Sequence, residues 1–267
     1  MSEPLQIEFR GRIGVITMCR GVTNAIHPNL ISGLDAALDQ IESVSDVRGI
    51  VLTGGEKFFS IGFDLPYLLT LPEPEFASFY RSFNQFCLKL FRFRLPVVAA
   101  LGGHATAGGC ILALCCDYRL IAEGRKLIGL NEVKLGLPVP FPADRMLHAL
   151  IGTRHARQVL ERGSFYEPPA ALDLGLVDKL GGLQDAIDRA AEIAKLGDHP
   201  VIDELGKTGL LDQLLEDMGA AQSQSGLTGQ LAGALNPLEA GENPFYRLWS
   251  VILLDPRFVG DGTGIRF

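Results

Sequence analysis

The chain has 267 residues, of which 47% are hydrophobic and 21% are charged, a composition ordinary for one large globular domain or for one domain with an appendage. The formal net charge is −7 and there is no basic run, which argues against nucleic-acid and anionic-membrane partners. No apolar run reaches the roughly 18–20 residues that span a bilayer, and residues 1–14 show no signal or transit pattern. Five cysteines, an odd number, fit reduced thiols. We therefore expect a soluble, cytoplasmic protein.

The N-terminal part of the chain alternates between strand patterns and helix patterns. Residues 5–17 predict a β-hairpin, because the stretches LQIEF and IGVIT flank the turn RGR. Residues 28–42 predict a helix, since apolar side chains recur at a helical period and Pro28 suits its first turn. The apolar run at 49–54 lies between chain breakers and predicts a buried strand.

The same pattern then repeats. A second amphipathic helix is predicted over residues 75–92, and it is followed by a strand over 96–101, a glycine loop, a helix through Cys116 and a strand over 118–122. The aromatic stripe on the helix at 75–92 is interpreted as core packing rather than as a cofactor site. Strands that alternate with helices favour an α/β fold.

Helical patterns dominate after residue 142. Short helices are predicted over 143–152, 153–163 and 168–178, and helical patterning continues over 183–219. Residues 220–243 are poor in charge and rich in Gly, Gln and Ser, which predicts a loop.

Residues 103–110, GHATAGGC, have nearly the spacing of a phosphate-binding loop. However, Gly109 and Cys110 stand where that loop needs Lys followed by Ser or Thr. The dinucleotide pattern GxGxxG and the serine-hydrolase pattern GxSxG do not occur, and Ser60 lies in the different context FFSIGFD. The sequence therefore predicts neither a nucleotide site nor a nucleophilic serine.

The cysteines and histidines do not form a metal-binding pattern. Cys110, Cys115 and Cys116 lack a CxxC pair, and the five histidines form no HxxxH or HExxH pair. The three cysteines are interpreted as small buried residues. His104 lies in the glycine loop and could act as a base, although a packing or hydrogen-bonding role is the favoured interpretation.

Two glycine turns remain as candidate chemistry. The turn KFFSIGFDL (57–65) follows the predicted strand at 49–54, and the turn ATAGGC (105–110) follows the one at 96–101. A helix that begins at Ala107 or Gly108 leaves its first N–H groups unpaired. If the two turns lie side by side, their backbone amides form an oxyanion hole. Ordinary turn glycines are the alternative, and the residues alone do not separate the two interpretations.

The remaining acid is Glu132, in LIGLNEVKLGLP (127–138), where it follows a short apolar predicted strand; on its own, this context favours a surface glutamate. Together with Asn24-Ala25, KFFSIGFDL and PVVAALGGHATAGGCILALCCDYRL, however, the segment resembles the crotonase family, also called enoyl-CoA hydratase/isomerase. The resemblance covers residues 5 to about 195 and is specific because the set occurs in order at this spacing. GGCILALCCDYRL and LIGLNEVKLG look closest to the single-glutamate 3,2-trans-enoyl-CoA isomerase branch.

The resemblance implies a crotonase-like spiral of repeated ββα units with a helical C-terminal region. Residues 1–195 would form the spiral core, and residues 196–267 a helical region for trimerisation or cover, with a loose segment at 220–243. The implied partner is an acyl-CoA thioester, and the implied assembly is a homotrimer or a dimer of trimers. No cofactor and no metal is expected, because coenzyme A is part of the substrate.

The resemblance also assigns residues to an acyl-CoA site. The backbone N–H groups of Phe63 and Gly108 would form the oxyanion hole that holds the thioester carbonyl. The residues expected to line the bound substrate are Ala25, Ser60, Ile61, Gly62, Asp64, Ile111 and Asn131.

Hydratases of this family use two glutamates, and this pattern decides the expected reaction. One of them would fall at Ile111, and the other matches Glu132. Adding water needs two acid–base groups, whereas moving a double bond needs one base. We therefore expect a shift of a 3-enoyl-CoA double bond to the 2-trans position, with Glu132 as the base and Asn131 holding the substrate. Hydration by another acid, thioester hydrolysis, decarboxylation and non-catalytic acyl-CoA binding remain alternatives.

Overall fold

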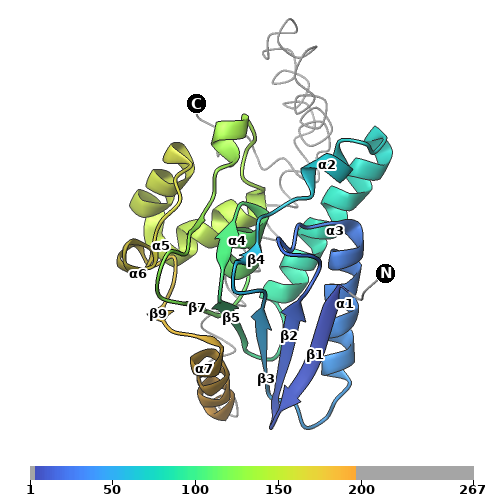
Figure 1. The fold of residues 1–267 in the computed structure, drawn as a ribbon, viewed down its shortest axis with the longest axis vertical. Helices are drawn as coiled ribbons and strands as arrows, with labels where there is room; N and C mark the ends of the chain where they lie inside the picture. The colour runs from blue at the N-terminus through green and yellow to red at the C-terminus, as the bar shows by residue number, and fades with distance from the viewer. Residues whose placement is uncertain (1–3, 197–267) are drawn as a thin grey trace, which may run out of the picture.

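The computed structural model describes residues 4–196, which form an α/β fold with two sheets (Figure 1). The larger sheet has six strands in the order β1-β2-β3-β5-β7-β9. Its strands are Leu5–Arg10 (β1), Ile13–Met18 (β2), Gly49–Thr53 (β3), Val97–Leu101 (β5), Tyr118–Ile121 (β7) and Lys179–Leu180 (β9). The smaller sheet has three strands, Phe58–Ser60 (β4), His104–Thr106 (β6) and Ile128–Gly129 (β8).

The helices follow the strands in a repeating order. They are Pro28–Glu42 (α1), Leu65–Leu68 (α2), Glu73–Phe91 (α3), Gly108–Leu114 (α4), Glu132–Leu135 (η1, a 3-10 helix), Phe141–Arg162 (α5), Pro168–Leu174 (α6) and Leu183–Leu196 (α7). Three successive units each give one strand to the larger sheet, one to the smaller sheet and then a helix: β3-β4-α2, β5-β6-α4 and β7-β8-η1. This repetition confirms the expected spiral of ββα units.

The pairing within each sheet explains why the smaller sheet exists at all. Only β1 and β2 are antiparallel; the other paired strands of residues 4–196 run parallel. Parallel neighbours need a long connection between them. The connection from β2 to β3 runs through α1 alone, whereas each later connection leaves the larger sheet, adds a short strand to the smaller sheet and returns through a helix. The carboxyl ends of β4, β6 and β8 therefore meet at one edge.

Strands β3 and β5 are buried along their whole length, because both faces of the larger sheet are covered. Alternate residues of a strand point to opposite faces. Val51 and Val98 pack with Ala186 and Ile187 of α7 on one face. Ile50 and Leu52 point to the other face and belong to the main core. Helices α1 and α3 contribute their apolar sides to this core. The continuous apolar run at 49–54 reflects this double coverage.

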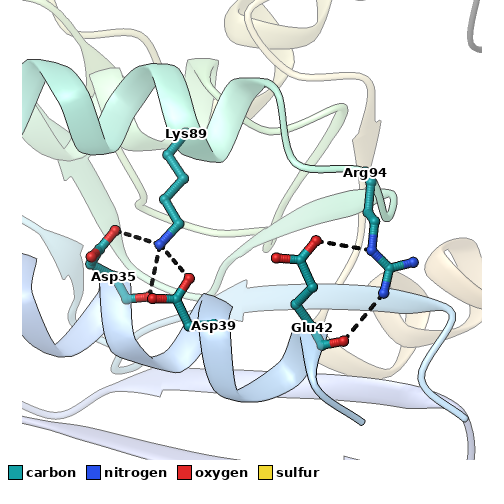
Figure 2. Close-up of polar contacts among 5 residues, drawn as sticks. All are labelled: Asp35, Asp39, Glu42, Lys89 and Arg94. Carbon is teal, nitrogen blue, oxygen red and sulfur yellow. Dashed lines mark hydrogen bonds and ion pairs between the residues drawn. The ribbon is translucent and has the colours of Figure 1, made fainter. Parts of the chain in front are cut away.

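Ion pairs connect α1 to the C-terminal half of α3 and the residues after it. Figure 2 shows Lys89 between Asp35 and Asp39, with its Nζ at 2.7 and 2.6 Å from their carboxylates. Arg94 lies beyond α3, and its Nε is 2.9 Å from Oε1 of Glu42. These side chains are partly exposed, so each pair contributes at most about 1 kcal/mol, and apolar packing holds the two helices together.

Most of the predicted elements are confirmed, with the hairpin, α1, α3 and the buried strands at or near their expected bounds. Helix α5 is interrupted at Gly152, where φ is 73° and ψ is 159°, in agreement with the two shorter helices expected there. In the smaller sheet, β8 is the short apolar strand expected before Glu132. Strands β4 and β6 were missed, because three residues each are too few for an alternating pattern to be recognised. No helix within residues 4–196 has the length and apolarity needed to span a bilayer.

The predictions that concern residues 197–267, including the loose segment at 220–243 and the trimerisation or cover region, lie outside the described residues. The division at residue 195 stays a prediction. Within the described part, α7 is the last element, and its packing on β3 and β5 makes it an integral part of the core.

An ion pair between Arg119 of strand β7 and Asp178, the residue before β9, offers a test of the fold. Asp178 accepts hydrogen bonds from the backbone N–H and from Nη2 of Arg119, at 2.8 and 2.7 Å, and the Arg119 side chain is 2% exposed. Asp178→Ala should lower the free energy of unfolding by about 3 kcal/mol, because it leaves a buried guanidinium without its counter-ion. Urea denaturation measures this loss.

The matched control is Asp46→Ala, since the carboxylate of Asp46 is 86% exposed and lies 3.8 Å from Arg12. Its loss should stay below about 0.5 kcal/mol. Equal losses in the two variants would show that the Arg119–Asp178 pair does not hold β7 in place.

Candidate active site

The two glycine turns lie side by side at the carboxyl edge of the smaller sheet. The parallel pairing of β4 with β6 brings them together. A Cβ atom at Gly62 would lie 2.9 Å from the backbone N of Gly108, and one at Gly109 would lie 2.2 Å from the backbone O of Ser60. Glycine is therefore required at both positions by the close approach of two backbones, and not only by the turn each one makes.

The backbone around Phe63 directs its N–H away from the neighbouring segment. Ile26 donates its N–H to the O of Gly62 at 2.8 Å and accepts from the N–H of Asp64 at 3.0 Å, which makes a parallel bridge around Phe63. In such a bridge the flanked residue turns its own N–H to the opposite side. Among residues 4–196 this N–H has no acceptor.

Gly108 offers a second N–H beside the first. It begins α4, and the N–H groups of a first helical turn have no acceptor within the helix. Ala107 before it has φ of 50° and ψ of −125°, a rare conformation for a residue with a Cβ. Such strain costs on the order of 1–3 kcal/mol and is commonly found at functional sites. Hydrogen bonds from Ala107 N–H to Gly129 O, at 2.9 Å, and from Ile111 N–H to Ala107 O, at 3.0 Å, hold the conformation.

Glu132 lies at the same edge, and its side chain is buried. It begins η1, three residues after Gly129 of β8, whose carbonyl accepts the Ala107 N–H. Glu132 is 8% exposed, and its Oε2 has no hydrogen-bond partner among the described residues. The surface position that its local context favours is therefore wrong: the pairing of β8 with β6 turns the start of η1 inward.

Burial raises the pKa of Glu132 to about 7, against a partial lowering by backbone hydrogen bonds from Glu132 itself and from Asn131. Cys110 of α4 and Tyr80 of α3 are also buried, and burial is the main cause that raises their pKa values. The nearby Glu132 carboxylate adds to both shifts. The acid thus lies between α3 and α4, and near neutral pH it is divided between its two protonation states.

Ile111 lies one helical turn after Ala107 on α4 and is 2% exposed. The position at which the resemblance places a second acid in hydratases is therefore apolar and packed into the main core.

Ser60, Ile61 and Asp64, three of the expected substrate-lining residues, belong to the first turn and have contacts that fix it. Ser60 is fully buried; its Oγ donates to Asn24 O at 2.8 Å and accepts from Gly62 N–H at 3.1 Å, so it fixes the first turn from behind. Asp64 accepts from the Tyr67 N–H at 3.4 Å and caps α2. Ile61 donates its N–H to Thr23 O at 3.1 Å. The contacts of these residues with a substrate stay predictions.

Sequence reasoning gave no structural role to two residues of this region, Asn24, which it noted only as part of the resemblance, and Arg20, which it missed. Asn24 is 1% exposed with φ of 46°, and its Nδ2 donates to Phe58 O at 3.3 Å. Arg20 pairs with Asp64, with its Nη2 at 2.9 Å from Oδ2, and donates through Nη1 to Ala25 O at 3.1 Å. The loop CRGVTN carries no periodic signal, although an Asn next to a turn is a common carrier of positive φ.

The remaining candidates from the sequence lie elsewhere or do not assemble. His104 begins β6, whereas Gly108 follows the end of that strand. Burial and the nearby Lys126, Arg125 and Lys57 lower the pKa of His104. Cys110, Cys115 and Cys116 are buried, as expected. Within residues 4–196, no three His, Cys, Asp or Glu side chains are grouped so that they could hold a metal ion.

The family to which this site belongs follows from comparison with known proteins. The profile of the family described as enoyl-CoA hydratase/isomerase matches residues 8–215. The chain belongs to the enoyl-CoA hydratase/isomerase family. Among solved structures, a crystal structure of human mitochondrial delta3-delta2-enoyl-CoA isomerase has a TM-score of 0.74 and 27% identity, over 81% of this chain and 88% of that chain. The crotonase-like fold expected from the sequence is thereby confirmed.

Curated relatives within the family carry both isomerase and hydratase names. The mouse enoyl-CoA delta isomerase 1, mitochondrial, is 33% identical over 178 residues, which is 65% of this chain and 62% of the relative. The human protein of the same name is 34% identical over 159 residues, 59% of this chain and 53% of the relative. The short-chain-enoyl-CoA hydratase of Clostridium acetobutylicum is 31% identical over 208 residues, 76% of this chain and 79% of the relative. The chain thus spans less than two thirds of the mouse and human relatives.

The contact between the two turns predicts the effect of a small substitution. Gly109→Ala places a methyl group 2.2 Å from the Ser60 carbonyl oxygen, and two backbones must move apart to accept it. We expect a loss of about 3 kcal/mol in the free energy of unfolding. Gly102→Ala is the control, since its Cβ would meet nothing closer than 3.8 Å and should change stability by less than about 1 kcal/mol. A Gly109→Ala protein as stable as the control would contradict this contact.

The raised pKa of Glu132 predicts how stability depends on pH. A shift from 4.5 to about 7 means that the folded chain resists ionisation of this group. The loss of folding stability caused by this ionisation is absent below the pKa that Glu132 has in the unfolded chain and grows as pH rises. It is complete above the pKa in the folded chain, where it reaches about 3 kcal/mol. Glu132→Gln removes the ionisation. Relative to the unsubstituted chain, it should therefore gain about 3 kcal/mol in unfolding free energy between pH ~4 and pH ~8. A difference that does not change with pH would place Glu132 in contact with water.

Proposed function

We propose that this protein is an enoyl-CoA isomerase that moves the double bond of a 3-enoyl-CoA to the 2-trans position. The observation that carries the proposal is Glu132: one buried carboxylate, with a pKa of about 7 and an oxygen free of partners in the described chain, at the edge where the two glycine turns meet. A base whose pKa lies near the working pH is suited to both taking and returning a proton.

The proposed reaction proceeds through a thioester enolate. The N–H groups of Phe63 and Gly108 donate to the thioester carbonyl oxygen and stabilise the negative charge that develops on it. Glu132 removes a proton from C2, the electron pair delocalises into the carbonyl and across the double bond, and the same proton is returned to C4. The reaction has no net oxidation or reduction and adds no water, so one acid–base group is sufficient and no cofactor is required.

The packing at Ile111 supports isomerisation over hydration. Hydration requires a second group to orient and deprotonate water, and Ile111 is an apolar side chain, 2% exposed, at the place that the resemblance gives to that group. The isomerase names of the mouse and human relatives, and of the human structure, agree with this choice.

Binding and assembly form part of the same proposal. Ala25, Ile61, Gly62, Asp64 and Asn131 would line the path of the acyl-CoA, and Ser60 would support the first turn from behind. Coenzyme A enters as part of the substrate. A homotrimer or a dimer of trimers, as the resemblance implies, and a cytoplasmic location, as expected from the composition, complete the proposal.

Hydration is the second candidate, because the Clostridium acetobutylicum hydratase matches over 79% of its own length. A panel of acyl-CoA esters that vary in length and double-bond position, together with one ester that carries a free carboxylate, separates the candidates. Loss of the double bond of a 2-enoyl-CoA shows hydration, release of free CoA thiol shows thioester hydrolysis, and loss of a carboxyl group as carbon dioxide shows decarboxylation. Tight binding of every ester without turnover would show a non-catalytic acyl-CoA-binding protein.

Glu132→Gln tests the base directly. The amide keeps the size of the side chain but cannot accept the C2 proton, so isomerisation of a 3-enoyl-CoA should fall at least about a thousandfold. The dissociation constant for a saturated acyl-CoA should change by less than about threefold, because the N–H donors are intact. Substantial residual turnover would assign the proton transfer to another residue.

The pH dependence of kcat follows from the same group. Glu132 acts as a base only when ionised, and its pKa is raised to about 7. The rate should therefore fall about tenfold for each pH unit below 7 and level off above it. A rate that stays constant down to pH ~5 would mean that the base keeps an ordinary carboxyl pKa in the complex.

A further inference from the structure

The turn that carries Phe63 is joined to the loop before α1 by contacts on both of its sides. Ile61 N–H donates to Thr23 O at 3.1 Å, ahead of Phe63, and Asp64 N–H donates to Ile26 O at 3.0 Å, behind it. These backbone contacts align the two segments. A further contact is needed to keep the two segments at a fixed separation when a ligand accepts a hydrogen bond from the Phe63 N–H.

Arg20 bridges the two segments with its side chain. Its Nη1 donates to the carbonyl O of Ala25 at 3.1 Å, and its Nη2 lies 2.9 Å from Oδ2 of Asp64. Ala25 precedes Ile26, and Asp64 follows Phe63, so one guanidinium connects the two segments diagonally across the bridge. The planar fork of arginine suits two acceptors in a fixed geometry, which lysine cannot reproduce.

The pair is shielded from water more than the surface ion pairs of this protein. The side chain of Arg20 is 27% exposed and that of Asp64 is 18% exposed, whereas the Arg12–Asp46 pair is 58% and 86% exposed. Shielding strengthens the attraction and makes the loss of one partner costly for the other. Asp64 also caps α2 through Oδ1, with Tyr67 N at 3.4 Å. Its carboxylate is therefore fixed from two directions.

The direction of the Phe63 N–H depends on a peptide bond that is otherwise easy to rotate. Gly62 precedes it with φ of 91°, and glycine has more conformational freedom than any other residue. The Phe63 ring is fixed by Phe79 and Phe83 of α3, with centroids at 5.3 and 4.8 Å. The ring contacts hold the side chain, and Arg20, through Asp64, holds the backbone that follows.

We propose that Arg20 is a positioning residue of the oxyanion hole: by holding Asp64 against Ala25, it fixes the Phe63 N–H in line with the Gly108 N–H. This inference rests on the proposed function, because the oxyanion hole is part of it. Arg20 does not contact the thioester in this assignment. Its positive charge gives it one competing role, the binding of a coenzyme A phosphate, and the two roles have different kinetic consequences.

Kinetics separate the two roles. Arg20→Met should lower kcat for a 3-enoyl-CoA by about tenfold to a hundredfold, the range expected when a donor is misplaced by a fraction of an ångström to about 1 Å. KM should change by less than about threefold, because the donor acts mainly on the transition state. A raised KM with unchanged kcat would instead assign Arg20 to phosphate binding and overturn the proposal.

Three further variants test whether the loss of kcat depends on the Arg20–Asp64 pair. Asp64→Asn keeps a good helix cap but removes the charge, and it should lose a similar factor in kcat. The double variant Arg20→Met/Asp64→Asn should lose no more than the larger single loss, since both act through one contact. Arg20→Lys should recover part of the rate. Arg12→Met, which removes an exposed arginine of an ion pair, is the control and should keep the full rate; a similar loss there, or fully additive losses in the double variant, would overturn the proposal.

A spectroscopic measurement tests the position without turnover. Hexanoyl-CoA labelled with carbon-13 at its carbonyl has no double bond to move, and its carbonyl stretching band shifts to lower frequency when two N–H groups polarise it. We expect this shift in the unsubstituted and Arg12→Met proteins and a smaller shift in Arg20→Met. No shift in the unsubstituted protein would overturn the oxyanion hole and this inference together. Equal shifts in the unsubstituted and Arg20→Met proteins would overturn the role of Arg20 alone.

Discussion

The structure depends on one close approach of two backbones. The turn after β4 and the start of α4 touch without side chains between them, because Gly62 faces the Gly108 nitrogen and Gly109 faces the Ser60 carbonyl. Packing at this distance brings the Gly108 nitrogen against the turn that carries Phe63, which flexible side chains could not do at equal precision. The short parallel strands of the smaller sheet hold the approach, and the larger sheet with its helices supplies the core that holds those strands.

The same edge also holds the feature that is least favourable for stability. A carboxylate at Glu132 has little contact with water, and Ala107 beside it keeps a positive φ. Each of these costs free energy in the folded state. Ala107 directly precedes Gly108, and Glu132 lies three residues after Gly129, whose carbonyl accepts the Ala107 N–H. Concentrated strain and burial of this kind are expected where a protein performs acid–base chemistry, since the ordinary carboxyl pKa is too low for a base that must also return its proton.

How far the sequence predicts this protein differs from one element to another. The helix at 28–42 and the strand at 49–53 follow directly from the spacing of their apolar residues. Strands β4 and β6 could not be recognised, because three residues carry no period, whereas the apolar residues before Glu132 did indicate β8. The residues that flank Glu132, LIGLN and VKLG, likewise do not predict that its side chain is buried. Local context favours the surface, and the resemblance to a family supplied the opposite expectation. Arg20 had no signal at all, since its partners Ala25 and Asp64 are brought to it by the fold.

The sequence by itself determined the class of fold, the order of its units and the residue types available for chemistry, because these depend on periodicity and on glycine positions that can be read along the chain. It also determined that Ile111 is apolar. Tertiary structure decided that the two glycine turns meet, that Glu132 is withdrawn from water with a pKa near 7, and that Arg20 reaches Asp64. The physical reason is that close approach, desolvation and ion pairing are properties of groups distant in sequence, and they exist only once strands from separate units have paired.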